Sequence, residues 1–134
     1  MEEDIFVKNR VLHVKYYTRE MPVEYDDLGT LYEGYISHRV GVNLPMSVLR
    51  EKFRTHRFCK YDADYIIVYK DVQTLIHELM HAKFYLDSDY RKKIQKRWEN
   101  LSEKEKSRIQ KKLFQYGYPE SVHVDEWQAY GFYV

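Results

Sequence analysis

The sequence has few of the residues that mark secreted, membrane or linker segments. Cys59 is the only cysteine among 134 residues, so no disulfide can form within the chain, and we expect a reducing compartment. No apolar run approaches the ~20 residues of a membrane-spanning helix, which predicts no membrane association. The start, Met1 to Asp4, is acidic and lacks the basic and apolar regions of a signal peptide. Together these absences predict a cytoplasmic protein.

Repeats, low-complexity tracts and linkers are also missing, while aromatic residues are abundant. Aromatic side chains make up 16% of the chain, fourteen of them tyrosines, which argues against disorder. A chain of 134 residues is long enough for one hydrophobic core. We therefore predict a single domain over residues 1–134.

Local patterns predict a mixture of strands and helices, hence an α+β fold. Apolar alternation and turn-forming residues predict strands at 11–17, 35–42 and 62–69, with turns at Pro22, Asp26-Asp27, Gly29 and Gly34. Helical spacing of apolar residues predicts helices at 46–56, 72–86, from about 90, from 102 and at 124–133. Pro45 and Asp71 suit helix starts, and Ser102 with Glu105 forms a capping-box pattern whose helix should turn Ile109, Leu113 and Phe114 inward.

The pentad His77-Glu78-Leu79-Met80-His81 lies inside the predicted helix 72–86 and is the most informative motif of the chain. Residues four apart share one helix face, so His77 and His81 can present two imidazoles to one zinc ion. Glu78 is placed to reach a water at the open coordination position and to take its proton. The pattern predicts a catalytic zinc site with Glu78 as general base.

A catalytic zinc site needs a third protein ligand. Glu126 is our first choice, because it lies in a predicted helix that can pack beside the motif helix, and Ala129 one turn later permits close approach. Asp87 follows His81 by six residues, but Phe84 stands where a turn glycine would be needed. The remaining alternatives are His123, Asp89 and Asp125.

A strand, then HELMH in a helix, then a downstream helix with Glu126 and Ala129 in an E-x-x-A pattern resembles the gluzincin branch of zinc metallopeptidases. The long gap from His81 to Glu126 is similar to that of the catalytic domain of anthrax lethal factor, the Pro-Pro endopeptidases and small zincins of the ImmA/IrrE type. The resemblance covers residue 65 to the C-terminus. It implies a minimal zincin-like fold, in which a small twisted sheet has an edge strand, here 65–69, over the HExxH helix and a C-terminal glutamate helix.

The resemblance also implies roles for individual residues. His77, His81 and Glu126 match the zinc ligands, and Glu78 matches the general base. A tyrosine before the glutamate donates a hydrogen bond to the oxyanion in lethal-factor-like enzymes, which implies Tyr118 or Tyr116, with His123 as the alternative donor. Tyr130 stands where gluzincins often have an acid that orients a zinc-bound histidine.

These residues predict a zinc metallopeptidase that hydrolyses a protein or peptide substrate added as a strand to residues 65–69.

The distribution of charge predicts a different function. Residues 91–112 contain ten basic and three acidic side chains. The alternative is therefore a non-catalytic, zinc-stabilised module that contacts nucleic acid or an acidic partner through these basic helices.

Overall fold

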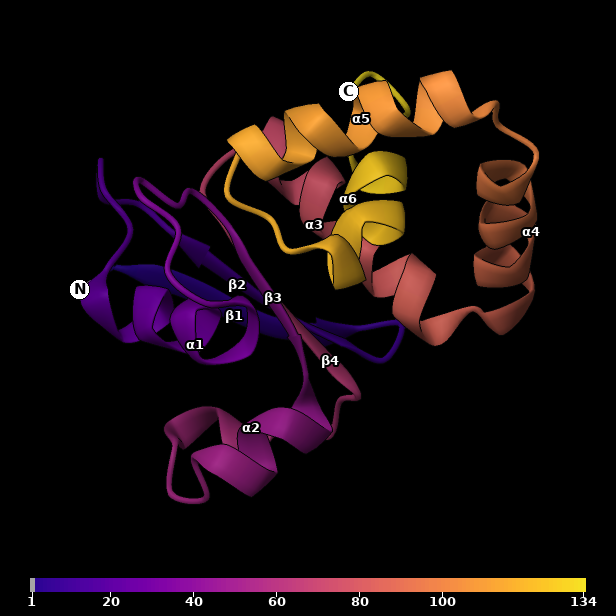
Figure 1. The fold of residues 1–134 in the computed structure, drawn as a ribbon. Coiled ribbons are helices and arrows are strands. Elements are labelled where there is room, and N and C mark those ends of the chain that lie inside the picture. Colours follow the sequence, from indigo (N-terminus) through magenta and orange to yellow (C-terminus); the bar gives the residue numbers. More distant parts are fainter. Residues whose placement is uncertain (1) are drawn as a thin grey trace. The chain divides into compact units, whose positions relative to one another are not determined.

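A computed structural model describes residues 2–134 and contains a mixed four-stranded sheet with six α-helices (Figure 1). The α+β fold class predicted from the sequence is therefore confirmed. The chain divides into two compact units, 1–82 and 83–134. The single domain predicted over 1–134 stays a prediction. Among residues 2–134, no helix combines the length and apolar character needed to cross a bilayer.

The first unit is built on the sheet, whose strand order is β1-β2-β4-β3. Strands β1 (Glu3–Lys8) and β2 (Val11–Tyr16) form a hairpin whose two turn residues, Asn9 and Arg10, both have positive φ. Such a turn matches the right-handed twist of the strands it joins. Strand β4 (Tyr65–Tyr69) pairs parallel with β2, and β3 (Val42–Pro45) pairs antiparallel with β4.

One face of the sheet carries the main hydrophobic core of this unit. Alternate residues of the strands point to that face, and α1 (Val23–Glu33), α2 (Met46–Lys52) and the 3-10 turn Arg57–Lys60 complete the unit. The largest fully buried side chains of the core include Tyr16, Tyr25, Phe58, Leu12, Leu44, Leu49 and Ile66.

Two sequence predictions in this unit are wrong. The turn residues between Pro22 and Gly34 lie in or beside helix α1. Gly29 is a helical residue whose missing Cβ leaves room for the Arg39 side chain, since a Cβ there would lie 2.7 Å from Nε. The predicted strand 35–42 is irregular except at Val42. Strand β3 starts there instead and continues to Pro45, which also precedes α2 as predicted.

The edge strand also differs from the prediction. Residues 65–69 form a strand, but β4 is bonded on both sides, by β2 and by β3. The edges of the sheet are β1 and β3. A five-residue run of buried apolar and aromatic residues is typical of such an interior strand, because both of its faces need cover.

The second unit contains α4 (Ser88–Glu99), α5 (Glu103–Gln115), the 3-10 turn Glu120–Val122 and α6 (His123–Ala129). Its core consists of Ile94, Ile109, Leu113, Trp127 and Val134. Ser102 caps α5 by accepting a hydrogen bond from the Glu105 amide at 3.1 Å, as predicted. Phe114 was expected to point inward but is 53% exposed, because Ile109 and Leu113 alone occupy the buried stripe of the helix.

Candidate metal centre

Helix α3 (Val72–Leu86) carries the HExxH pentad, and its start is fixed as the sequence predicts. Asp71 Oδ1 accepts a hydrogen bond from the Thr74 amide at 2.8 Å, which satisfies one of the free amides of the first turn. Hydrogen bonds from Thr74 also hold the pKa of Asp71 below its usual range. The cap sets the phase of the helix, so the positions of His77, Glu78 and His81 follow from it.

His77 and His81 turn the same ring nitrogen toward one point. Their Nε2 atoms lie 3.2 Å apart, and His81 is 2% exposed. Two imidazoles bound tetrahedrally to zinc at ~2.0–2.1 Å would have nitrogens about 3.3 Å apart. The separation of the two nitrogens is therefore close to that of two ligands of one metal ion.

Glu126, on α6, is the third member of the group. His77, His81 and Glu126 each offer one ligand atom, and these atoms lie within 4.8 Å of one another. Glu126 is 3% exposed, and a buried carboxylate is stable only with a partner that offsets its desolvation. The three residues, of which His81 and Glu126 are buried and His77 is half-buried, form a group that could hold a metal ion, as the sequence predicts.

The other predicted third ligands have different surroundings. Asp87 caps α4 by accepting a hydrogen bond from the Tyr90 amide at 3.0 Å. Asp125 Oδ1 accepts a hydrogen bond from Gln128 at 2.9 Å. Within residues 2–134, no second group of this kind brings together three or more histidine, cysteine or carboxylate side chains.

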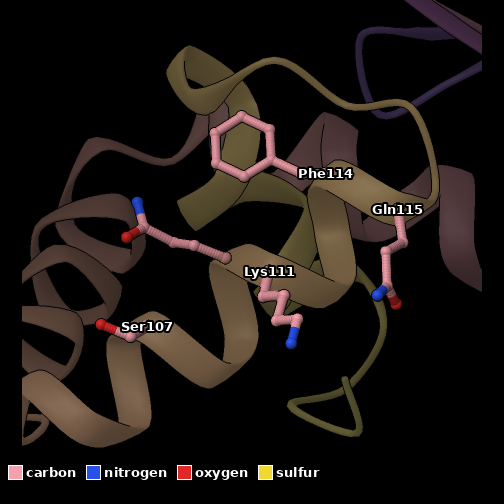
Figure 2. A pocket seen from close by; sticks show the side chains of 5 residues that line it. Ser107, Lys111, Phe114 and Gln115 are labelled. Atoms are coloured by element: carbon pink, nitrogen blue, oxygen red, sulfur yellow. The ribbon is translucent and has the colours of Figure 1, made fainter.

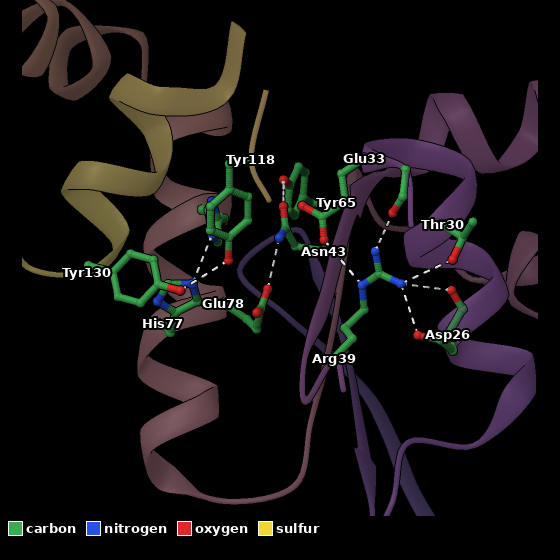
Figure 3. A network of polar contacts seen from close by, with 12 residues as sticks. Asp26, Thr30, Glu33, Arg39, Asn43, Tyr65, His77, Glu78, Tyr118 and Tyr130 are labelled. Carbon is green, nitrogen blue, oxygen red and sulfur yellow. Dashed lines mark hydrogen bonds and ion pairs between the residues drawn. The ribbon is translucent and has the colours of Figure 1, made fainter. Parts of the chain in front are cut away.

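Glu78 is held by residues that the sequence analysis did not single out. Asn43 Nδ2 donates a hydrogen bond to Glu78 Oε2 at 2.9 Å, and the Tyr65 hydroxyl donates one to Asn43 Oδ1 (Figure 3). Gly41 lies so close that a Cβ there would be 2.5 Å from Glu78 Oε1. These residues come from β3, β4 and the segment before β3, and no local pattern in the sequence links them to the pentad.

The predicted oxyanion donors lie in the second unit. The Tyr118 and Tyr130 hydroxyls are 3.1 Å apart, and both rings are drawn in Figure 3. The buried His123 donates from Nε2 to the Tyr118 carbonyl at 2.9 Å, and the Phe114 ring packs edge-on against its imidazole. The Tyr116 ring packs against that of Tyr130, with centroids 6.0 Å apart. The His123 Nε2 is thus engaged with a backbone carbonyl, and the Tyr118 hydroxyl contacts that of Tyr130.

One surface depression lies on α5. It has a volume of about 610 Å³, and its lining side chains all come from that one helix (Figure 2). They are Ser107, Gln110, Lys111, Phe114 and Gln115. This open helix face contains none of the predicted site residues.

Comparison with known proteins returns no relative: no protein-family model, no curated protein and no solved structure matches the chain.

Proposed function

We propose that the chain is a zinc-dependent metallopeptidase in which His77, His81 and Glu126 hold the metal and Glu78 is the general base. The observation that carries the proposal is the largely buried group of two imidazoles and a carboxylate, whose ligand atoms lie within 4.8 Å of one another and whose imidazoles belong to an HExxH helix. Two nitrogen ligands and one oxygen ligand are a donor set that zinc takes in hydrolases and that leaves one position open.

The reaction needs a base, a proton carrier and an oxyanion donor. Zinc, when bound, polarises the scissile carbonyl and makes the attacking water more acidic. Glu78 takes a proton from that water as its oxygen bonds to the carbonyl carbon, and passes the proton to the amine nitrogen as the C–N bond breaks. One water and one peptide bond give one carboxylic acid and one amine, and transfer of the second water proton between them leaves a carboxylate and an ammonium ion. We assign the oxyanion hydrogen bond to the Tyr118 hydroxyl, a contribution of about 3 kcal/mol where such donors have been removed.

The substrate strand is expected at β3, since the interior position of β4 leaves it no free edge. The Met46 amide donates to the Asp64 carbonyl at 2.9 Å, which sets the alternation of the antiparallel pair. Alternate residues of β3 therefore point their N–H and C=O groups in opposite directions. Those of Val42 and Leu44 point toward β4, and those of Gly41 and Asn43 point away from it. An extended peptide would pair with these outward groups, beside the Glu78 carboxylate.

The experiment is cleavage of a proteome-derived peptide library by the zinc-loaded protein, with products identified by mass spectrometry. We expect defined cleavages by the wild type and none by Glu78→Gln, which keeps the shape of the side chain but cannot take the proton. Glu120→Gln, a matched change at an exposed position, should cleave like the wild type. Equal cleavage by the wild type and Glu78→Gln would overturn the proposal.

The alternative function, binding of nucleic acid or an acidic partner, depends on the basic side chains of α4 and α5. Several of them have partners within the second unit: Arg91 donates to the Phe84 and Tyr85 carbonyls, Arg108 to the Val134 carbonyl, and Arg97 lies over Phe132. The exposed lysines are Lys92, Lys93, Lys96, Lys104, Lys111 and Lys112. If they bind a nucleic acid backbone, affinity for a DNA duplex should fall steeply with salt.

A further inference from the structure

The side chain of Asn43 connects the base Glu78 to the interior of the sheet. Its Nδ2 donates to Glu78 Oε2 at 2.9 Å, and its Oδ1 accepts from the Tyr65 hydroxyl (Figure 3). Asn43 is 6% exposed, Tyr65 1% and Glu78 4%. Because water has so little access to these side chains, a hydrogen bond to solvent cannot readily replace one that is lost.

The contact has a direction, because an asparagine amide has a donor end and an acceptor end. Oδ1 can only accept, so the Tyr65 hydroxyl must donate to it. With Oδ1 held by Tyr65, the two protons of Nδ2 face the Glu78 carboxylate. A flipped amide would set Oδ1 against a carboxylate oxygen and would lose the hydrogen bond to Glu78, while its Nδ2 could still donate to the Tyr65 oxygen. By donating to Oδ1, Tyr65 favours the orientation in which Asn43 donates to Glu78.

The other carboxylate oxygen of Glu78, Oε1, lies against the backbone of Gly41. A Cβ on residue 41 would be only 2.5 Å from Oε1, so a glycine at this position leaves room for the carboxylate. The segment before β3 is fixed in turn, since the Tyr16 hydroxyl donates to the Val40 carbonyl at 2.7 Å. The buried Arg39 donates to the Asp26 carboxylate at 2.9 Å and to the Gly34 carbonyl at 2.7 Å. Both oxygens of Glu78 thus have defined neighbours.

From this geometry we infer that Asn43 is the positioning residue of the general base, and that Tyr65 sets the Asn43 amide so that it donates to Glu78. The inference rests on the proposed peptidase function. Its chemical consequence is a carboxylate held in one rotamer before the substrate arrives. A displacement of about 1 Å in a reacting group can lower the rate about 10²-fold. Loss of the hydrogen bond from Asn43 to Glu78 should therefore lower kcat.

The kinetic test uses a peptide that the library experiment identifies as cleaved. Asn43→Leu should lower kcat by about 100-fold with little change in KM and with zinc content unchanged. Tyr65→Phe keeps the ring but frees the amide to flip, and should lower kcat by a smaller factor of about 10. Tyr35→Phe, a change at an exposed tyrosine, is the matched control and should behave like the wild type.

The spectroscopic test needs no turnover. In the metal-free protein, the Asn43 side-chain amide is observed by ¹⁵N–¹H correlation and assigned by its loss in Asn43→Leu. A charge-assisted hydrogen bond should place one amide proton downfield of ordinary asparagine amides, and Glu78→Ala should remove that displacement. Tyr65→Phe should reduce it, because the flipped amide no longer donates to Glu78.

The outcomes separate the two proposals. If Glu78→Gln still hydrolyses the library, the peptidase function fails, whatever the amide shows. If Glu78→Gln is inactive but Asn43→Leu keeps the wild-type kcat, the positioning role alone is overturned. An Asn43 amide resonance that does not respond to Glu78→Ala would overturn it as well, even if the library yields no cleaved peptide.

Discussion

The two units of the chain place their functional residues by different means. In residues 1–82, Glu78 is held by a polar network of Asn43, Tyr65 and Gly41. In residues 83–134, Glu126 lies on the seven-residue helix α6, whose neighbour Trp127 packs among aromatic rings. A polar network fixes the direction of a side chain, whereas apolar packing fixes the position of a helix. We therefore expect changes in the polar network around Glu78 to alter local order and, on the proposed function, catalysis, and changes in the apolar packing around Trp127 to alter stability.

The largest expected effect on stability is that of Trp127→Ala. Trp127 is 3% exposed, its ring centroid lies 5.3 Å from that of Trp98 and 4.8 Å from that of Phe132, and Arg97 stacks over it. Truncation should lower the free energy of unfolding by about 3–5 kcal/mol, since it opens a cavity in a small core. Urea unfolding followed by circular dichroism would measure the change.

Tyr133→Ala is the control for this prediction, because it removes an aromatic ring that is 91% exposed. It should change stability by less than about 0.5 kcal/mol. Similar losses in Trp127→Ala and Tyr133→Ala would show that aromatic packing around α6 is not what stabilises the second unit.

A somewhat smaller effect is expected for Arg39→Met in the first unit. The Arg39 side chain is buried and binds the Asp26 and Glu33 carboxylates and the Gly34 carbonyl. Removing one partner of a buried ion pair costs about 3–5 kcal/mol, but Asp26 is partly exposed, so we expect about 2–3 kcal/mol. The same unfolding assay applies.

Arg10→Met provides the matched comparison. Arg10 pairs with Asp64 at 2.7 Å, but both side chains are more than half exposed. Surface pairs of this kind contribute about 0–1 kcal/mol. If Arg39→Met costs no more than Arg10→Met, the network before β3 does not hold the segment that carries Gly41.

The smallest effect is a pH dependence from His13. Burial, with a smaller contribution from the Lys8 charge, lowers the pKa of His13 below 6.5, and burial also lowers that of His56. The unfolded chain therefore binds these protons at higher pH than the folded chain does. The contribution of the neutral histidines to the free energy of unfolding is fully present above the unfolded pKa of about 6.5. It falls as the pH drops below that value.

Urea titrations at about pH 7.5 and about pH 5.5, on either side of the ordinary histidine pKa, would measure the difference. We expect His13→Gln to reduce the loss of stability at the lower pH and His38→Gln, a change at an exposed position, to leave it unchanged. A loss that is the same in the wild type and in His13→Gln would argue against a buried neutral His13.

The sequence predicted those features that depend on neighbours along the chain. The caps at Asp71 and Ser102, the helix start after Pro45 and the HExxH helix follow from local hydrogen bonding and periodicity. Glu126, the first choice of the sequence for a third ligand, lies in the group that could hold a metal ion.

Other features depend on contacts between distant residues, and the sequence did not indicate them. Gly29 was interpreted as a turn residue, yet it is helical, and its missing Cβ leaves room for Arg39, ten residues later. Strand β4 was taken for an edge because the zincin resemblance implied one, and its partner β3, a short strand with a proline and an asparagine, was not predicted. The role of Asn43 follows from two side chains, 22 and 35 residues away, that only the fold brings to it.

Metal content measured by elemental mass spectrometry tests the central claim most directly. We predict about one zinc per chain in the wild type purified in the presence of zinc, as expected for a site with three protein ligands. Glu126→Ala should lose most of it, and Asp87→Ala, which alters only the cap of α4, should keep it. Zinc retained in Glu126→Ala, or absent from the wild type, would contradict the account.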